Sequence, residues 1–214
     1  MITKEAVRIQ EISDTIDGLN AINNPHCNLS IWNREISHEM KSYIDILVQK
    51  TFTSQSKKDE LNGLLRELLA SLPYSSHPGY QEFFQDIQLL YGFMQQLSRN
   101  PNPKIHLALI HQTQCPLFHV DFNHLRLICT YKGKGTQWIE EENSDRRHLG
   151  CGRNEEVVRD LNLIHQAKQT SVAILKGERF PGNMGYGIIH KSPELEEGES
   201  RLFLRIESSP SYNL

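Results

Sequence analysis

Residues 115–138 read CPLFHVDFNHLRLICTYKGKGTQW, and this stretch is the most informative part of the chain for its fold class. A His and an Asp, His119 and Asp121, stand one residue apart and precede a run rich in β-branched and aromatic residues, 125–131. A Gly-Lys-Gly turn then leads to a Trp. Because alternate side chains of an extended chain share a face, His119 and Asp121 can point the same way. The stretch therefore predicts two metal ligands at the edge of a strand.

The composition of the chain is that of a globular protein. Of its 214 residues, 38% are hydrophobic and 23% are charged, with a formal net charge of −3. These values exclude a disordered chain, and the absence of a Lys/Arg cluster gives no reason to expect nucleic acid. The longest apolar runs, 106–110 and 172–175, are far shorter than the roughly 20 residues that span a bilayer, so no membrane is expected.

The cellular location is inferred from the N-terminus and the cysteines. The first 18 residues contain no apolar segment of the kind found in secretory signals. The four cysteines form no Cys-x-x-Cys pair, so reduced thiols and a cytoplasmic location are expected. The cysteines are Cys27, Cys115, Cys129 and Cys151.

The pattern of apolar residues changes near residue 100. Helical periodicity comes first and predicts helices over 38–50, 57–72 and 81–99, with one short strand over 27–32. The Pro-rich segment NPNP then marks a boundary, and strands are predicted over 104–112, 125–131, 170–177, 186–192 and 200–208.

These patterns predict an α+β protein in two parts. A mainly helical region, 1–103, packs on the outside of a metal-binding β core, 104–214. Several short strands with Gly and Pro turns and no regular strand–helix alternation indicate an antiparallel barrel or sandwich.

A third metal ligand is predicted from the same chemistry. One His and one carboxylate are two thirds of the facial triad that binds non-haem iron(II) and leaves coordination positions open. The missing ligand should be a His on another strand. His190 ends a glycine-flanked apolar segment, where close backbone approach suits a buried ligand.

The last predicted strand carries two arginines on one face. Arg201, Phe203 and Arg205 alternate with aliphatic residues. Buried arginines are costly without partners, and a bound dicarboxylate would supply partners because guanidinium groups hold carboxylates in a bidentate fork. The strand therefore predicts that one arginine points into a barrel that holds a ligand with carboxylates.

The pattern of His-x-Asp, a later His and then a basic residue resembles the iron(II)- and 2-oxoglutarate-dependent oxygenases of the double-stranded β-helix fold. More closely, the chain resembles a bacterial family known as domain of unknown function 1826. The segments that carry this resemblance are CPLFHVD (115–121), LRLICTYKGKGTQW (125–138), VVRD (157–160), VAILKGE (172–178), PGNMGYGIIHKSP (181–193) and RLFLRIE (201–207), with CNLSIWNR (27–34) as an N-terminal marker.

The resemblance implies a fold and an activity. The fold is an antiparallel double-stranded β-helix, a jelly-roll or cupin-like barrel, and the activity is hydroxylation of an unknown small-molecule or protein substrate with Fe(II) and 2-oxoglutarate. His119, Asp121 and His190 become the metal ligands and catalytic centre. The implied 2-oxoglutarate and pocket residues are Arg201, then Arg205, with Arg126, Tyr131 and Trp138 lining the pocket; Arg126 is also a candidate for a simple ion pair.

Two other functions use the same residues. In the first, the three ligands hold zinc in a non-catalytic protein of metal homeostasis. Its expected partner is a metallochaperone GTPase, because genes of the family often lie near those of zinc-responsive GTPases. In the second, an open zinc site activates water in a hydrolase, for which no general base is evident. Cys115 and Cys129 are interpreted as small buried hydrophobes; otherwise Cys115 with His119 and His190 would form a softer zinc site.

Overall fold

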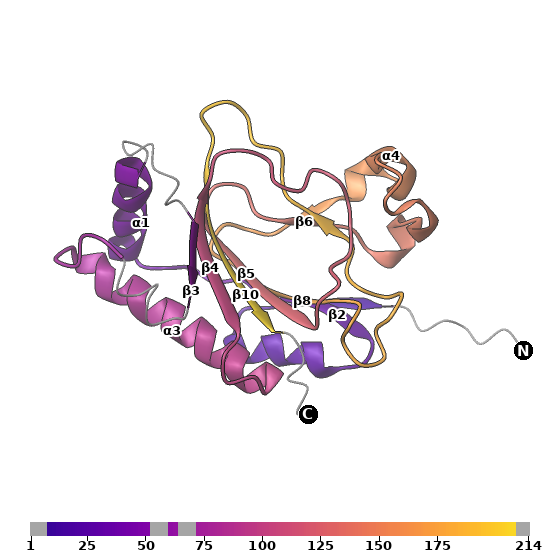
Figure 1. Ribbon diagram of the computed structural model, residues 1–214, viewed down its shortest axis with the longest axis horizontal. Coiled ribbons are helices and arrows are strands. Elements are labelled where there is room, and N and C mark those ends of the chain that lie inside the picture. The colour runs from indigo at the N-terminus through magenta and orange to yellow at the C-terminus, as the bar shows by residue number, and fades with distance from the viewer. Residues whose placement is uncertain (1–7, 52–59, 64–71, 209–214) are drawn as a thin grey trace, which may run out of the picture.

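The fold is built on two β-sheets that lie one above the other (Figure 1). A computed structural model describes residues 8–51, 60–63 and 72–208. The larger sheet has seven strands, which in spatial order are β1 (Ile9–Ser13), β2 (Cys27–Trp32), β8 (Val172–Lys176), β5 (Leu125–Lys132), β10 (Arg201–Ser208), β4 (Lys104–Ile110) and β3 (Glu60–Gly63). The smaller sheet has three, β7 (His165–Gln166), β6 (Gln137–Trp138) and β9 (His190–Lys191). All pairs are antiparallel except β1 with β2.

Side chains on the central strands alternate strictly between the two faces of the larger sheet. Those facing the helices are aliphatic or aromatic and belong to the main core, for example Leu127, Cys129 and Tyr131 of β5 and Leu202, Leu204 and Ile206 of β10. The opposite face mixes polar and apolar side chains. It carries Arg126, Ile128 and Thr130 of β5 and Arg201, Phe203 and Arg205 of β10. Because the period is two residues, the aliphatic positions of β10 fix which way its arginines point.

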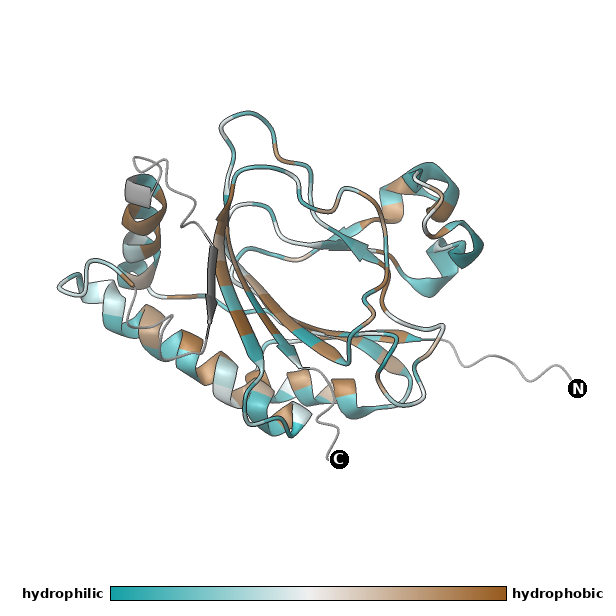
Figure 2. Cartoon of the chain, viewed as in Figure 1, coloured by the Kyte–Doolittle hydropathy of each residue, from teal (hydrophilic) through white to brown (hydrophobic). Residues whose placement is uncertain are grey.

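In the described part of the chain, three helices cover the outer face of the larger sheet. The helices are η1 (Ile16–Asn23), α1 (His38–Thr51) and α3 (Pro78–Ser98), and their buried side chains join the main core. Figure 2 shows hydrophobic residues concentrated in the strands, with hydrophobic and polar turns alternating along α3. The helices thus bury one face of the larger sheet, and the other face is turned toward the smaller sheet.

A polar insertion between β6 and β7 forms a separate small layer at the far end of the short sheet (Figure 1). It consists of one-turn elements, η2 (Glu141–Asn143), η3 (Arg146–His148), α4 (Asn154–Val157) and η4 (Leu161–Leu163). Its apolar residues Val157 and Val158 pack with Phe118, Ile139 and Ile189 in a cluster of their own. The insertion therefore rests directly on segments 117–120 and 188–190.

The mixed α+β class and the helices over 38–50 and 81–99 are confirmed, with helix bounds His38–Thr51 and Pro78–Ser98. A closed barrel is not found among the described residues, because β1 and β3 remain as edges of the larger sheet. The helix expected over 57–72 is wrong at Glu60–Gly63, which is strand β3, and its other residues, apart from Leu72, lie outside the described ones.

The region before residue 104 contributes three strands to the sheet, where one was expected, and the domain division at residue 103 stays a prediction. The strand expected over 186–192 shortens to His190–Lys191, and residues 186–189 before it form no regular secondary structure. No helix in the described part of the chain combines the length and the apolar character that crossing a bilayer requires.

Candidate metal centre

Three side chains with metal-binding groups meet where the segment before β5 pairs with β9. His119 and His190 face each other in an antiparallel bridge, with backbone hydrogen bonds of 3.0 and 2.9 Å and ring centroids 4.5 Å apart. Asp121 Oδ2 lies 3.6 Å from His190 Nε2, and Asp121 Oδ1 lies 3.9 Å from His119 Nε2. The donor atoms of all three residues lie within 4.8 Å of one another, so the structure brings together the three ligands that the sequence predicted.

Hydrogen bonds to the backbone set the tautomer of both imidazoles. His119 Nδ1 lies 2.9 Å from the Leu117 carbonyl oxygen, and His190 Nδ1 lies 3.0 Å from that of Ile188. Since a carbonyl oxygen only accepts, Nδ1 carries the proton and Nε2 of the neutral ring keeps its lone pair toward Asp121. Burial lowers the pKa of His190 to about 4, so this ring is neutral near pH 7, as metal ligation requires.

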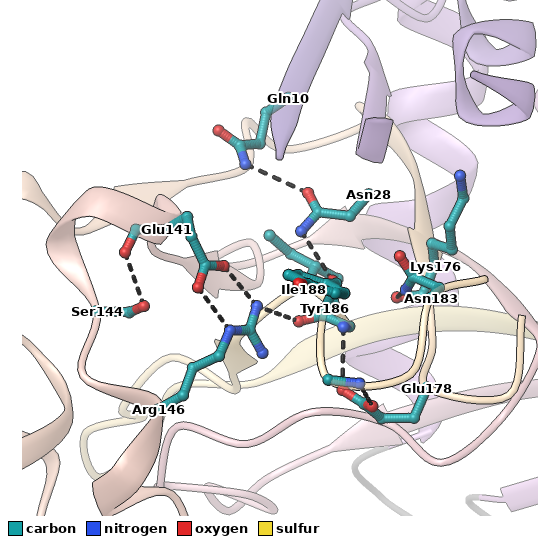
Figure 3. Close-up of polar contacts among 12 residues, drawn as sticks. Gln10, Asn28, Glu141, Ser144, Arg146, Lys176, Glu178, Asn183, Tyr186 and Ile188 are labelled. Carbon is teal, nitrogen blue, oxygen red and sulfur yellow. Dashed lines mark hydrogen bonds and ion pairs between the residues drawn. The ribbon is translucent and has the colours of Figure 1, made fainter. Parts of the chain in front are cut away.

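The segment that leads into β9 is held by polar contacts from three directions (Figure 3). Gly187 N donates to Glu178 Oε1 at 3.0 Å, and Arg146 Nη2 donates to the Gly187 carbonyl at 2.8 Å. Asn28 Nδ2, from β2, donates to the carbonyl of the residue before that glycine at 3.2 Å. A Cβ at position 187 would stand 2.9 Å from Glu178 Oε1, so a larger residue there would displace the Glu178 carboxylate from this contact. These contacts hold the strand that carries His190.

Arg126 connects the metal-binding group to the neighbouring strand. Its Nη1 lies 2.6 Å from Asp121 Oδ2, and its Nε donates to Glu207 Oε1 at 2.8 Å. Arg126 and Glu207 are paired across β5 and β10. The ion-pair interpretation of Arg126 is therefore confirmed, and the contact orients the Asp121 carboxylate from behind.

Arg201 is buried on the same face without a carboxylate. Arg201 is 2% exposed. Its Nη2 donates to Thr130 Oγ1 at 3.0 Å and to Thr136 Oγ1 at 3.4 Å. Its guanidinium lies 4.8 Å from the centre of the Phe203 ring. Its Nε has no hydrogen-bond partner, and no described carboxylate lies within ion-pair distance. Burial lowers the pKa of Arg201 to about 10. A bound anion would supply what this guanidinium lacks.

A cleft runs from the two histidines to Arg205. Arg205 Nη2 lies 3.1 Å from His106 Nδ1, and Arg205 Nε lies 3.7 Å from Glu207 Oε1. The cleft has a cavity volume of about 50 Å³. Its lining residues from both sheets include His119, Arg126, Ile128, Thr136, His190, Lys191, Phe203 and Arg205. A smaller apolar pocket continues from it between the sheets and is lined partly by Trp138, in agreement with the predicted role of that residue.

Two predicted positions are corrected by the structure. Tyr131 points to the helix-covered face, where its hydroxyl donates to Asp86 Oδ2 at 2.6 Å, so it does not line the cleft. Strand alternation is the reason, because Arg126 and Tyr131 are an odd number of residues apart. Cys115 is exposed and lines the cleft, whereas it was expected to be buried; Cys129 is buried as expected.

Three hydrogen-bond partners of Arg126 and Arg201 were missed by sequence reasoning. Thr130 and Glu207 could have been found, because they lie at even spacings from Arg126 and Arg205 on strands already predicted. Thr136 follows the Gly-Lys-Gly turn and has no signal in the sequence. Its side chain reaches Arg201 only because the chain turns back there toward the short sheet.

Comparison with known families gives one match over almost the whole chain. The family described as protein of unknown function (DUF1826) matches residues 13–207. Curated protein sequences give no match.

Solved structures of low sequence identity share the fold. A Shewanella oneidensis protein assigned as an oxygenase has 11% identity and a TM-score of 0.54, covering 95% of this chain and 90% of its own. AtDAO1, a dioxygenase for auxin oxidation from Arabidopsis thaliana solved with 2-oxoglutarate, has 8% identity and a TM-score of 0.53, covering 95% and 93%. A full-length Neurospora crassa protein, solved in complex with α-ketoglutarate and 5-formyluracil, has 9% identity and a TM-score of 0.53, covering 100% and 88%.

Proposed function

The chain belongs to the family described as protein of unknown function (DUF1826), and we propose that it is a non-haem iron(II)- and 2-oxoglutarate-dependent oxygenase that hydroxylates a small-molecule or protein substrate. The observation that carries the proposal is the pairing of two features in one inter-sheet space. A two-histidine, one-carboxylate group converges at the cleft, and Arg201, buried on the same face of the larger sheet, has no carboxylate partner among the described residues. Oxygenase-like structures that share the fold support it.

The donor set fits iron(II). Two imidazole nitrogens and one carboxylate form a facial group that leaves other positions open. Ligands at about 2.1 Å and right angles would stand about 3.0 Å apart, and the observed donor atoms lie within 4.8 Å. Small side-chain rotations at His119 and Asp121 would close that difference, while His190 stays fixed because its side chain is buried and that of His119 is about one third exposed.

The opposite end of the space fits the co-substrate. Arg201 offers its unpartnered Nε to a carboxylate, and the hydroxyls of Thr130 and Thr136 already stand beside it. Arg205, one third exposed on the same face, is the second candidate. The cleft has a cavity volume of about 50 Å³, and the partly exposed side chains of Phe203 and Arg205 that line it would move to admit 2-oxoglutarate.

When bound, iron(II) and 2-oxoglutarate would supply the oxidant that inserts oxygen from O₂ into a C–H bond. The chain supplies the rest. Arg126 bridges the carboxylates of Asp121 and Glu207 and so orients the first of them, and Arg201 binds and orients the co-substrate. Ile128, Leu175 and other apolar side chains between the sheets exclude water from the space.

The finer fold is part of the same proposal. The cluster formed by Leu29, Ile31, Ile128, Trp138, Ala173, Leu175 and Ile188 joins the inner faces of both sheets, as expected for two packed sheets of a double-stranded β-helix. This arrangement would place the metal-binding group at one end of the inter-sheet space and the arginines on its floor.

The test is a titration of the anaerobic Fe(II)-loaded protein with 2-oxoglutarate. We expect a visible charge-transfer band that is lost in Arg201→Met, although that variant still binds iron. Arg205→Met is the matched control and should weaken the band without abolishing it. Stoichiometric zinc with no response to 2-oxoglutarate would contradict the proposal and favour the zinc-binding alternative. The GTPase partner of that alternative stays a prediction.

A further inference from the structure

The insertion between β6 and β7 carries a second group of metal-type donors. His148 ends η3, Cys151 lies in the glycine turn that follows, and Glu156 lies in α4. Their ligand atoms all lie within 4.8 Å of one another. We propose that these three side chains bind a zinc-type divalent ion at a structural site separate from the iron centre.

The three donors already converge. His148 Nδ1 lies 3.1 Å from Glu156 Oε2, and the other carboxylate oxygen of Glu156 pairs with Arg153, so a single oxygen faces the group. The Cys151 thiol donates to the Arg153 carbonyl at 3.4 Å. Thiolate, imidazole and carboxylate are the ligands that zinc takes in four-coordinate sites, and the exposure of Cys151 leaves room for a water as the fourth ligand.

A second carboxylate orients the histidine from its other side. Asp145 Oδ2 lies 3.9 Å from His148 Nε2. The hydrogen bond from Arg147 holds the pKa of Asp145 well below its usual range, so this carboxylate stays ionised. In the structure Nδ1 donates to Glu156 Oε2, so a bound ion would replace the proton on Nδ1, and the nearby Asp145 carboxylate would then favour the proton on Nε2.

The turn that carries the thiol can accommodate the small contraction that a bound ion requires. Gly150 and Gly152 flank Cys151 with φ of 84° and 86°, and a Cβ at either position would meet nothing within 4 Å. Zinc bonds of about 2.0–2.3 Å need donor separations roughly 1 Å shorter than the widest one present. The open space around the turn permits a shift of that size.

The position of the insertion indicates what such an ion would do. Asn154, at the start of α4, accepts a hydrogen bond from Phe118 N at 2.8 Å and donates to the Pro116 carbonyl at 2.9 Å. Val157 packs in one cluster with Phe118 and Ile189. Those last two residues directly precede the two histidines of the iron centre. An ion that ties η3 to α4 would therefore stabilise the layer that supports both histidines.

Cobalt(II) titration of the full chain under reducing conditions tests the site. A thiolate bound to Co(II) gives an intense near-ultraviolet charge-transfer band, and the proposed iron ligands include no thiolate. We expect the band in the wild type and in Asp121→Ala, and its loss in Cys151→Ser. Because Cys151 is exposed, this variant should fold normally.

Cys115→Ser is the matched control, since Cys115 is also exposed but lines the iron cleft. It should keep the band. Absence of the band from the wild type, or its loss in Cys115→Ser and retention in Cys151→Ser, would overturn the proposal. As a second readout, zinc should raise the melting temperature of Asp121→Ala and not that of the Asp121→Ala, Cys151→Ser double variant. Neither readout depends on 2-oxoglutarate, so a negative result here would contradict the zinc site without bearing on the proposed oxygenase activity.

Discussion

Arg34 and Arg201 are both buried against the larger sheet, on opposite faces, and they have opposite surroundings. Arg34 meets Asp86 of α3 through both terminal nitrogens, and Nη2 donates to Asp86 Oδ2 at 2.8 Å. Burial is the largest single influence and would lower the pKa of Arg34, but the Asp86 carboxylate together with Cys129 and Tyr131 outweighs it and raises that pKa. Arg201 has two hydroxyls and an aromatic ring, and burial lowers its pKa without opposition.

The difference distinguishes a structural charge from one that we propose is held for a ligand. An unpaired buried charge costs several kcal/mol, and removing one partner of a buried pair is strongly destabilising. Arg34 therefore fastens α3 to the sheet through Asp86, together with the hydroxyl of Tyr131. Arg201 has no such structural pairing among the described residues, and we propose that it is retained in the core to bind a carboxylate.

The largest expected effect is on the helix-covered face. Asp86→Ala should lower the free energy of unfolding by about 3–5 kcal/mol, because it leaves Arg34 buried and unpaired. Urea denaturation measures this. Asp45→Ala is the control: its partner Lys132 is 2.8 Å away but both side chains are nearly half exposed, so the loss should stay below about 1 kcal/mol. Equal losses in the two variants would remove the distinction between these pairs.

On the cleft face, Arg201→Met should change the free energy of unfolding by no more than about 1 kcal/mol, because no buried carboxylate is left behind. The effect of this substitution should instead appear in the stabilisation that 2-oxoglutarate provides. Metal and 2-oxoglutarate at about 100 times Kd should stabilise the wild type by about 2.7 kcal/mol over metal alone, and Asp86→Ala by the same increment. Arg201→Met should gain nothing from 2-oxoglutarate. A full gain in that variant would show that Arg201 is not the anchor.

Arg126 is intermediate between Arg34 and Arg201. Like Arg34 it is paired with a carboxylate, but its partner is a proposed metal ligand. Arg126→Met should weaken metal affinity by about 10-fold, since the Asp121 carboxylate loses the contact that orients it. Competition with a chromophoric chelator measures the change. Lys41→Met removes the same charge from an exposed pair with Glu35 and should leave metal affinity unaltered.

The smallest expected effects come from adjacent residues of β5 that face opposite ways. Tyr131→Phe removes a hydrogen bond to Asp86 and should cost about 1 kcal/mol of stability, with 2-oxoglutarate affinity unchanged. Thr130→Val removes a hydroxyl beside Arg201 and should lower 2-oxoglutarate affinity by roughly 10-fold, with a smaller effect on stability. Calorimetric titration measures the 2-oxoglutarate affinity of both variants, and urea unfolding measures their stability. If both variants lost stability and affinity to the same extent, the opposite orientation of the two side chains would have no functional consequence and the prediction would be wrong.

Much of this comparison could be predicted from local patterns. The two-residue period of β10 separates Leu202 and Leu204 from Arg201 and Arg205, and the structure keeps that separation. The same rule applied from Arg126 assigns Thr130 to the cleft and Tyr131 to the helices. The position of this strand was predicted correctly, but Tyr131 was assigned to the wrong face of it.

Other features had no local signal. Residues 186–189 were predicted as part of a strand, yet the strand is confined to His190–Lys191, because side chains from β2, the insertion and Glu178 form hydrogen bonds with the backbone of the two residues before Ile188. The grouping of His148, Cys151 and Glu156 likewise depends on how η3 and α4 pack.

The sequence alone determined the composition of each face and the chemical type of the metal-binding group, because strand alternation and ligand chemistry act over a few residues. Only the tertiary structure decided which charges are paired. Asp86 reaches Arg34 from 52 residues away, whereas no carboxylate reaches Arg201 from any described element. Pairing depends on the packing of distant elements, and that packing left one buried guanidinium open to a ligand.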